Sequence, residues 1–316
     1  MIKSIYTNTS RWQDRHTKRE TGCIQLNLLK KRILQTIFIF LMCSMPSAVI
    51  AGAWIPKPAN GYAKIWLKWL PGLDYLDGQG NLIPYGQYHE LFLNGYVEVG
   101  LLPSLGAWIH FPMLRNFWLE DHPSGSMKHH ITIGDPAIGL RWGLVEKQRI
   151  RISVELGGRM PLASGEPVQK IFNKNSPNKQ IGNLRIGRGV WELQGSILLG
   201  YTWDWIYIGM SVGYIFMSNQ FDGVINWTTE TGFQLRKLWH MRIRITGWHP
   251  LGNGNAAYHD TVSGLGNGTG YAGFSLEVDY NFLPKWFVGV CIEGGLFRVR
   301  RQTTGPVISP YVAFQF

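Results

Sequence analysis

Residues 149–160 read RIRISVELGGRM, and apolar and polar side chains alternate along this segment. One row holds Ile150, Ile152, Val154, Leu156 and Met160, and the opposite row holds Arg149, Arg151, Ser153, Glu155 and Arg159. Because side chains on a strand point alternately to its two faces, this pattern predicts a strand with one apolar and one charged face. A soluble sandwich would bury the apolar face in a core. A membrane barrel would turn that face to lipid and the charged face to the lumen.

Alternating segments of this kind recur along the chain, at a spacing that fits one hairpin after another. The predicted strands are 61–69, 87–100, 105–113, 135–144, 149–160, 190–201, 205–216, 224–235, 239–248, 270–281, 286–297 and 306–316. Most of them reach the roughly 9–11 residues that a tilted strand needs to cross a bilayer, whereas strands of globular proteins average about five or six. Their length therefore favours the membrane barrel.

The connections between these strands alternate between short turns and long loops. The turns are Leu101–Ser104, Val145–Gln148, Thr202–Asp204, Arg236–Leu238 and Phe282–Lys285, and the loops are 70–86, 114–134, 161–189, 217–223, 249–269 and 298–305. Short periplasmic turns and long extracellular loops are typical of outer-membrane barrels. We therefore predict an all-β protein, a closed antiparallel transmembrane β-barrel of about 12 strands, in the bacterial outer membrane. The alternative is a β-sandwich.

The last segment, 307–316, reads VISPYVAFQF and ends on an aromatic residue. It resembles the C-terminal assembly signal of bacterial outer-membrane β-barrels, carried here by Tyr311, Phe314 and Phe316. The resemblance implies that the barrel-assembly machinery is a partner. Outer-membrane lipid and lipopolysaccharide are the expected surroundings. Since a barrel leaves no free edge, this strand must pair with 61–69.

The start of the chain has the features of a secretory signal peptide. Lys30, Lys31 and Arg32 precede an apolar run, 33–49, and a small-residue cleavage pattern ends at Ala51. The run falls short of the roughly 20 apolar residues that span a bilayer, so a retained membrane anchor is the less favoured alternative. We predict an N-terminal extension and cleaved signal peptide over 1–51 and an outer-membrane barrel over 52–316.

Cleavage changes the charge of the protein. It removes eight of the 31 basic and two of the 20 acidic residues, which lowers the formal net charge from +11 to +5. Much of the basic character therefore belongs to the signal peptide, and nucleic-acid binding loses its main support. Cys291 is the one cysteine of 52–316, so an internal disulfide or a cysteine-rich metal site is not expected there.

The charged row of the predicted strands would line the lumen. Its members are Lys64, Lys68, Glu90, Glu98, Arg141, Arg149, Arg151, Glu155, Arg159, Glu192, Glu230, Arg242, Arg244, Glu277, Asp279 and Glu293. Two roles stay open: these residues pair across the lumen and hold the barrel in shape, or they line a passage for a small polar or anionic solute. Lumenal aromatic residues (Trp66, Trp108, Trp205, Tyr207 and Trp248) would make the pore narrow or partly plugged.

Other aromatic side chains fall near the ends of the outward rows, where amphipathic rings favour the membrane interface. The predicted girdle residues are Trp69, Trp142, Tyr201, Tyr214, Trp239, Tyr280, Trp286 and Phe316.

Two segments carry a family resemblance. Residues 134–142 read GDPAIGLRW, and residues 157–165 read GGRMPLASG, in which Ala163-Ser164 replaces the usual Pro-Thr pair. The chain resembles outer-membrane transporters grouped under the label "MetA-pathway of phenol degradation". The resemblance implies a bacterial outer-membrane barrel that moves small molecules.

Three alternatives to a narrow small-solute channel remain. The first is a structural or surface-loop barrel for adhesion or envelope integrity. The second is a lipid-modifying enzyme that uses His259 with Ser263, or His122 with Ser124 or Ser126, but no orienting Asp or Asn lies at a recognisable spacing. The third is a loop metal site at His122, His129 and His130. We predict a channel that is not an enzyme and has neither cofactor nor metal.

Overall fold

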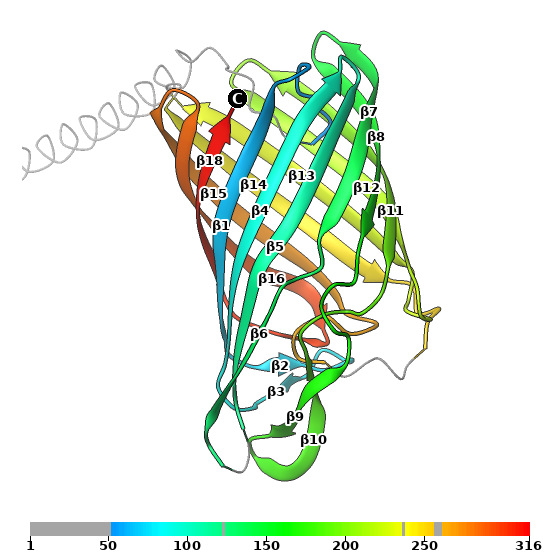
Figure 1. Cartoon of the computed structure of the whole chain (residues 1–316), viewed down its shortest axis with the longest axis vertical. Helices are drawn as coiled ribbons and strands as arrows, with labels where there is room; N and C mark the ends of the chain where they lie inside the picture. Colours follow the sequence, from blue (N-terminus) through cyan, green and yellow to red (C-terminus); the bar gives the residue numbers. More distant parts are fainter. Residues whose placement is uncertain (1–51, 122–123, 236–237, 256–260) are drawn as a thin grey trace, which may run out of the picture. The chain divides into compact units, whose positions relative to one another are not determined.

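The computed structural model describes residues 52–316 except 122–123, 236–237 and 256–260; the predicted signal peptide lies outside the described residues. Twelve strands form a closed antiparallel barrel (Figure 1). In order around the barrel they are β1 (Gly61–Gly72), β4 (Tyr88–Leu102), β5 (Leu105–Glu120), β7 (Ala137–Lys147), β8 (Ile150–Arg159), β11 (Glu192–Trp203), β12 (Ile206–Met217), β13 (Val224–Leu235), β14 (Trp239–Pro250), β15 (Gly270–Leu283), β16 (Trp286–Arg300) and β18 (Val307–Gln315). The predicted fold class is confirmed. Among the described residues, no helix is long and apolar enough to cross a membrane.

The barrel closes where β1 meets β18. Tyr62 of β1 lies opposite Gln315 of β18. The backbone N–H of Gly61 donates to the carbonyl oxygen of Phe316 at 3.1 Å, and the N–H of Phe316 donates to the carbonyl oxygen of Gly61 at the same distance. These hydrogen bonds satisfy backbone N–H and C=O groups that would be costly to leave unpaired in lipid.

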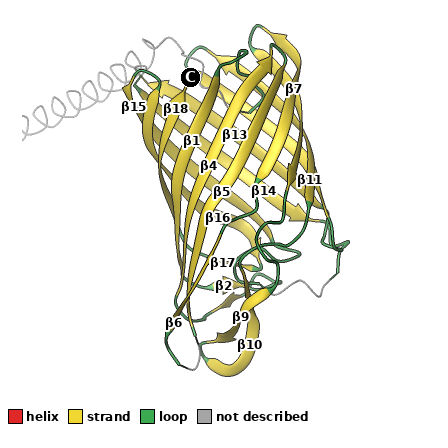
Figure 2. Ribbon diagram, viewed as in Figure 1, coloured by secondary structure: helices red, strands yellow, loops and turns green. Residues whose placement is uncertain are grey.

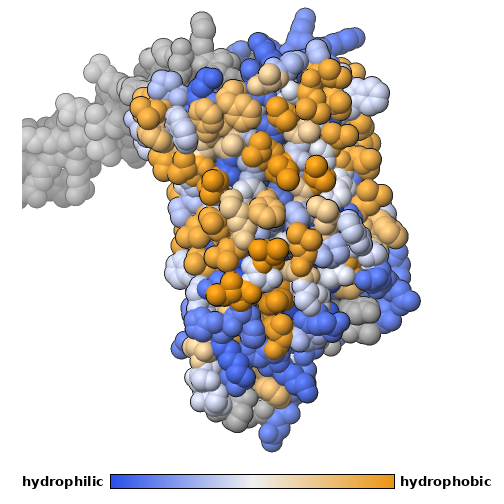
Figure 3. Space-filling model, in the orientation of Figure 1, coloured by the Kyte–Doolittle hydropathy of each residue, from blue (hydrophilic) through white to orange (hydrophobic). Residues whose placement is uncertain are grey.

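Alternation decides which side of the wall each side chain occupies. On β11, Leu193 is 54% exposed, whereas the adjacent Glu192 is 6% exposed. The outward row is apolar around the barrel, and Figure 3 shows this belt in orange on the face in view. It includes Ile65, Ile109, Leu140, Ile197, Ile208, Val212, Ile243, Val288 and Val290. An apolar outer face on a closed barrel matches the lipid environment and not water.

The two ends of the barrel differ, and we call them the turn end and the loop end. The turn end carries the short turns and both Gly61 and Phe316. Aromatic rings gather on its outside: the ring centroids of Trp239 and Tyr280 lie 4.8 Å apart, and another such pair is Trp286 with Phe314 at 4.6 Å. Such rings favour the interface between lipid and water.

The loop end carries additional short strands, which Figure 2 shows below the barrel. They are β2 (Tyr75–Leu76), β3 (Leu82–Ile83) and β17 (Gln302–Thr303) in one sheet, β9 (Pro167–Asn173) and β10 (Ser176–Arg185) in another, and β6 (Met127–Thr132), which extends the pairing of β5. These strands lie in segments predicted as loops. Most of them form local hairpins that are too short or too irregular for alternation to reveal, and the pairing of β17 with β2 joins pieces of chain distant in sequence.

The largest difference from the predicted strand limits is in β5. The strand was expected over 105–113 and continues to Glu120. Proline lacks the N–H of a ladder and commonly ends a strand. Here a register shift lets Asn94 pair with Pro112 and Leu93 with Leu114, and the carbonyl oxygen of Pro112 accepts from Gly134 at 2.9 Å. The bulge absorbs the proline, and the strand resumes beyond it.

Candidate functional site in the barrel lumen

The structure places most of the predicted charged row on the inside of the wall. These residues are Lys64, Lys68, Glu90, Glu98, Arg141, Glu155, Arg159, Glu192, Glu230, Arg242, Arg244, Glu277, Asp279 and Glu293. Arg149 is different: β8 begins one residue later, and Arg149 is an exposed turn residue 3.6 Å from Asp204. Arg151 lies near the same turn and pairs with the exposed Glu146 at 2.9 Å. Arg149 and Arg151 therefore pair with residues of the turn end, and not across the lumen.

Ion pairs bridge the middle of the lumen. Lys64 Nζ of β1 lies 2.8 Å from Glu277 Oε1 of β15, although two strands separate β1 from β15 in the wall. Arg242, opposite Glu277 on the neighbouring strand, lies 3.6 Å from the same carboxylate. Since a buried charge needs a partner, these contacts satisfy the side chains and also narrow the bore.

A second set of ion pairs lies towards β4, β7 and β8. Arg141 donates from Nη2 to Glu155 Oε2 at 2.8 Å, and its Nη1 lies 3.5 Å from Glu98 Oε2. Strand β5 separates β4 from β7, so Arg141 joins non-adjacent strands. On the facing wall, Arg244 lies 2.5 Å from Glu230.

A hydrogen-bonded group that the sequence did not single out lies near the turn end. His240 Nδ1 is 2.7 Å from Asp279 Oδ1, and the Tyr311 hydroxyl donates to Asp279 Oδ2 at 2.9 Å. Tyr311 is 4% exposed and faces inward, whereas the other two predicted assembly-signal residues, Phe314 and Phe316, stack on each other with centroids 6.1 Å apart.

Residues 52–60, which precede the first strand, lie against the lumen wall at the turn end; we call them the N-terminal plug. The Trp54 ring contacts Tyr207 edge-on, with centroids 5.5 Å apart. Ser153 Oγ donates to the carbonyl oxygen of Ala53 at 3.2 Å, and Arg141 Nη1 donates to that of Trp54 at 3.4 Å. Side chains of the lumen wall therefore hold the plug from several strands.

A small residue makes room for the plug. A Cβ atom added to Gly200 of β11 would lie 2.7 Å from the Trp54 ring, which is too close for two carbon atoms. The glycine therefore marks a close approach of the plug to the wall. Strand periodicity does not predict the plug because its contacts form only once the barrel has closed.

Two cavities occupy the lumen. The inner cavity, of about 380 Å³, lies towards the turn end, and its walls include Tyr62, Glu98, His240 and the 7%-exposed Cys291. The outer cavity, of about 1250 Å³, lies towards the loop end. Arg244 and Glu293 line both cavities, so the two meet at the level of these side chains.

The outer cavity contains charged residues that strand alternation did not predict. Arg115 lies on the part of β5 beyond Pro112, which was expected to be loop. Arg188 lies just before β11 and donates to Glu192 at 2.7 Å. Its position four residues before Glu192 is a pattern that sequence reasoning missed. Asp135 also lines the cavity and accepts from the Ala163 N–H at 2.8 Å.

One side of the outer cavity lacks a complete strand ladder. The pairing of β16 with β18 ends at Glu293 and Val307, although β16 continues to Arg300. Beyond that point Gly294 and Leu296 line the cavity, and so does the 42%-exposed Ile292 of the outward row. The cavity therefore reaches membrane-facing side chains at this place.

An aromatic and aliphatic cluster packs at the loop end. Its buried members include Tyr75, Tyr85, Tyr88, Phe92, Phe117, Leu119, Ile171, Leu184 and Val262, which come from loops and strand ends. The Tyr85 and Thr303 hydroxyl oxygens lie 2.6 Å apart. Burial raises the pKa of Tyr85 far above its ordinary value, so this phenol keeps its proton at all working pH values.

The residues proposed for catalysis or metal binding are only partly described. His122 and His259 lie outside the described residues. Ser263 Oγ donates to the Arg185 carbonyl oxygen at 2.8 Å, and Ser124 and Ser126 hydrogen-bond each other at 2.8 Å. His130 Nε2 lies 3.1 Å from Gln169 Oε1, and His129 packs edge-on against Trp118. In the part of the chain that is described, no group of three metal-ligating side chains occurs.

A closed barrel with an apolar outer belt and a charged, partly hollow lumen defines a membrane-spanning β-barrel. No known family profile matches the sequence, and no curated protein matches it. Among solved structures, the fold is similar to that of the COG4313 outer membrane channel from Pseudomonas putida F1, with a TM-score of 0.59, 10% identity, 85% of this chain covered and 100% of that one. At this identity the similarity concerns the fold alone.

Two further solved structures match with lower scores. The NanC porin matches with a TM-score of 0.46 and 9% identity, covering 82% of this chain and 100% of that one. The CymD monoaromatic hydrocarbon channel matches with a TM-score of 0.42 and 9% identity, covering 82% of this chain and 89% of that one.

Proposed function

We propose that the protein is a narrow channel of the bacterial outer membrane that admits small solutes. The observation that carries this proposal is the pair of cavities that meet at Arg244 and Glu293 inside a closed barrel. A barrel built only as a support could fill its lumen with side chains, as eight-stranded barrels do, whereas twelve strands leave a wider bore. Charged walls suit polar groups of a passing solute.

The asymmetry of the barrel supports its orientation. Short turns are typical of the periplasmic side, and long loops of the extracellular side. Outer-membrane lipid would then contact the apolar belt, and lipopolysaccharide the loop end. Phe314 and Phe316, at the turn end, would be read by the barrel-assembly machinery.

Two exits from the outer cavity are consistent with the geometry. One leads through the constriction at Arg244 and Glu293 to the inner cavity and the N-terminal plug. The other leads past Ile292 and Leu296 to the membrane-facing side. Polar solutes would need the first route, so the plug is expected to limit their passage.

Uptake into liposomes and single-channel conductance in planar bilayers test the function. Trp54→Ala shrinks the plug beside Tyr207 and is expected to raise the conductance and the uptake of small sugars. Trp203→Ala is the matched control, because Trp203 lies at the same end but is 57% exposed on the outer face. A folded barrel in which neither wild type nor Trp54→Ala conducts or takes up any solute contradicts the proposal.

A barrel that serves as a structural support is the second candidate. The observation in its favour is the bracing of non-adjacent strands by Lys64 with Glu277 and by Arg141 with Glu98. Under this alternative, changes to these pairs alter stability alone. Under the channel proposal they also alter ion selectivity.

Membership of the family labelled "MetA-pathway of phenol degradation" is part of this proposal and rests on the segments 134–142 and 157–165. Both segments contribute to the lumen: Asp135 and Arg159 line the outer cavity. A functional test of membership is whether solute uptake depends on Asp135, which also holds the backbone of Ala163.

A further inference from the structure

The outer cavity carries more positive than negative side chains. The cations on its wall are Lys68, Arg115, Arg159, Arg188, Arg244 and Arg298, and the anions are Glu90, Asp135 and Glu293. Charges of one sign on the low-dielectric wall of a cleft raise the local concentration of ions of the opposite sign. The cavity therefore favours a solute that bears negative charge.

Arg115 is one of the cations of this wall that have hydrogen-bonding capacity to spare. Its guanidinium carbon lies 4.6 Å from the centre of the Phe92 ring. Its Nε is buried and has no hydrogen-bond partner, and within the described residues no ion pair joins Arg115 to a carboxylate. The Nε atom packs beside Gly134 and has no accessible surface, so a carboxylate in the cavity would accept hydrogen bonds from the terminal Nη1 and Nη2 groups of the guanidinium.

The neighbouring carboxylates are already engaged. Glu90 accepts a hydrogen bond from the Tyr88 hydroxyl, and Asp135 accepts from the Ala163 N–H. Arg159 and Arg188 lie within electrostatic range of Arg115 and add like charge. An incoming anion would therefore be attracted by several cations at once, with Arg115 best placed to donate to it.

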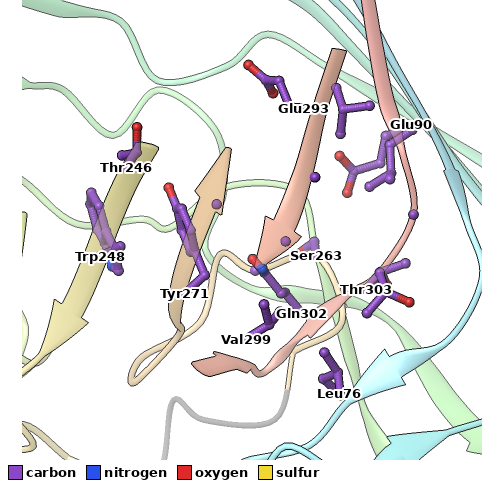
Figure 4. Close-up of a pocket in the computed structure, with 18 of the residues that line it drawn as sticks. Leu76, Glu90, Thr246, Trp248, Ser263, Tyr271, Glu293, Val299, Gln302 and Thr303 are labelled. Carbon is purple, nitrogen blue, oxygen red and sulfur yellow. The ribbon is translucent and has the colours of Figure 1, made fainter. Parts of the chain in front are cut away.

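Aromatic surface lies in the same cavity. Trp248 of β14 and Tyr271 of β15 lie opposite each other in register, and Figure 4 shows their rings side by side on the cavity wall. The Arg188 guanidinium carbon lies 4.8 Å from the centre of the Trp248 ring. A ring placed against Trp248 and Tyr271 would thus have cationic groups at its edge.

We propose that the outer cavity binds small aromatic carboxylates, with the carboxylate held by Arg115 and the ring packed against Trp248 and Tyr271. The planar guanidinium fork matches the two oxygens of a carboxylate, and a second ring gains from offset or edge-on packing with the aromatic pair. This inference rests on the proposed channel function and names its substrate class. The cavity, at about 1250 Å³, has room for a solute of this size.

Calorimetric titration of the purified full-length barrel in detergent tests the binding. The probes are benzoate, benzyl alcohol, which has the ring without the charge, and acetate, which has the charge without the ring. Benzoate is expected to bind at least about tenfold more tightly than either, a difference of about 1.4 kcal/mol, because it combines a charge-assisted hydrogen bond with ring packing and each of the other probes has only one of the two.

Variants assign the two halves of the interaction. Arg115→Met is expected to lower the affinity for benzoate about tenfold or more and to leave the affinity for benzyl alcohol unchanged. Arg115→Lys keeps the charge but loses the planar guanidinium, so its affinity for benzoate is expected to lie between those of wild type and Arg115→Met. Arg149→Met is the matched control, since that arginine is an exposed turn residue. Trp248→Leu is expected to lower the affinity for benzoate and to leave the affinity for acetate unchanged. Heat-modifiable migration on gels verifies that each variant is folded.

Several results would overturn the inference. If benzoate and benzyl alcohol bind equally well, the carboxylate is not recognised. If benzoate and acetate bind equally well, the ring is not recognised. If Arg115→Met binds benzoate as tightly as wild type, Arg115 is not the residue that holds the carboxylate. Liposome uptake separates this inference from the channel proposal. Uptake of neutral solutes without benzoate binding refutes the substrate class alone, and Arg115-dependent benzoate binding without any uptake refutes the channel alone.

Discussion

Glu277→Gln is expected to destabilise the barrel by about 3 kcal/mol, in line with the roughly 3–5 kcal/mol lost when one partner of a buried ion pair is removed. The carboxylate of Glu277 is 5% exposed and lies 2.8 Å from Lys64 Nζ and 3.6 Å from Arg242 Nη2. A neutral amide leaves these two cations facing each other without their shared counter-charge. Some water in the lumen softens this repulsion, which places the expected loss at the lower end of the range.

Equilibrium unfolding in urea, with the barrel in lipid vesicles and tryptophan fluorescence as the signal, measures this loss. Adding Lys64→Met to Glu277→Gln removes one of the two stranded cations and is expected to restore about 1 kcal/mol or more, since contacting groups couple by roughly 0.5–3 kcal/mol. The reasoning is refuted if Glu277→Gln alone stays within about 0.5 kcal/mol of wild type, or if the two changes are additive.

Three further outcomes follow from contacts near the turn end. Gly200→Ala places a methyl group 2.7 Å from the Trp54 ring, so it should displace the plug and raise single-channel conductance while the fold persists. Phe316→Ala removes the ring that stacks on Phe314 and is expected to lower the folded yield in the outer membrane, measured by the heat-modifiable band. Asp279→Asn weakens the bond to His240 and should lower unfolding stability by about 1–3 kcal/mol in urea titration.

Strand alternation, strand length and the alternation of short turns with long loops were together enough to predict the barrel. In a membrane barrel, both the lipid and the lumen impose a period of two on every strand, so twelve strands repeat one signal. The extent of β5 could not be predicted, because Pro112 is compatible with a strand only where a bulge forms against Asn94 and Leu93. A long-range pairing at the loop end was not predictable either. Tyr75 of β2 pairs with Thr303 of β17, and no local pattern announces so distant a partner.

The sequence predicted which charged residues would face the lumen, but not which of them would contact one another. Alternation indicated that Lys64 and Glu277 would face inward, but their 2.8 Å contact depends on the curvature that brings β1 towards β15. Arg115 and Arg188 were missed because one follows a proline and the other precedes its strand. The N-terminal plug carries no periodic signal, and its place beside Gly200 is set by the closed wall.

The buried thiol of Cys291 in the inner cavity can report the width of the pore. Cys291 is the one cysteine between residues 52 and 316, and its position on the inner-cavity wall lies past the constriction as seen from the loop end. A graded series of maleimides applied from either side of a membrane would therefore label the protein only up to the diameter that each entrance admits. Within residues 52–316, Cys291 is thus a single chemical reporter that ranks the two entrances by width.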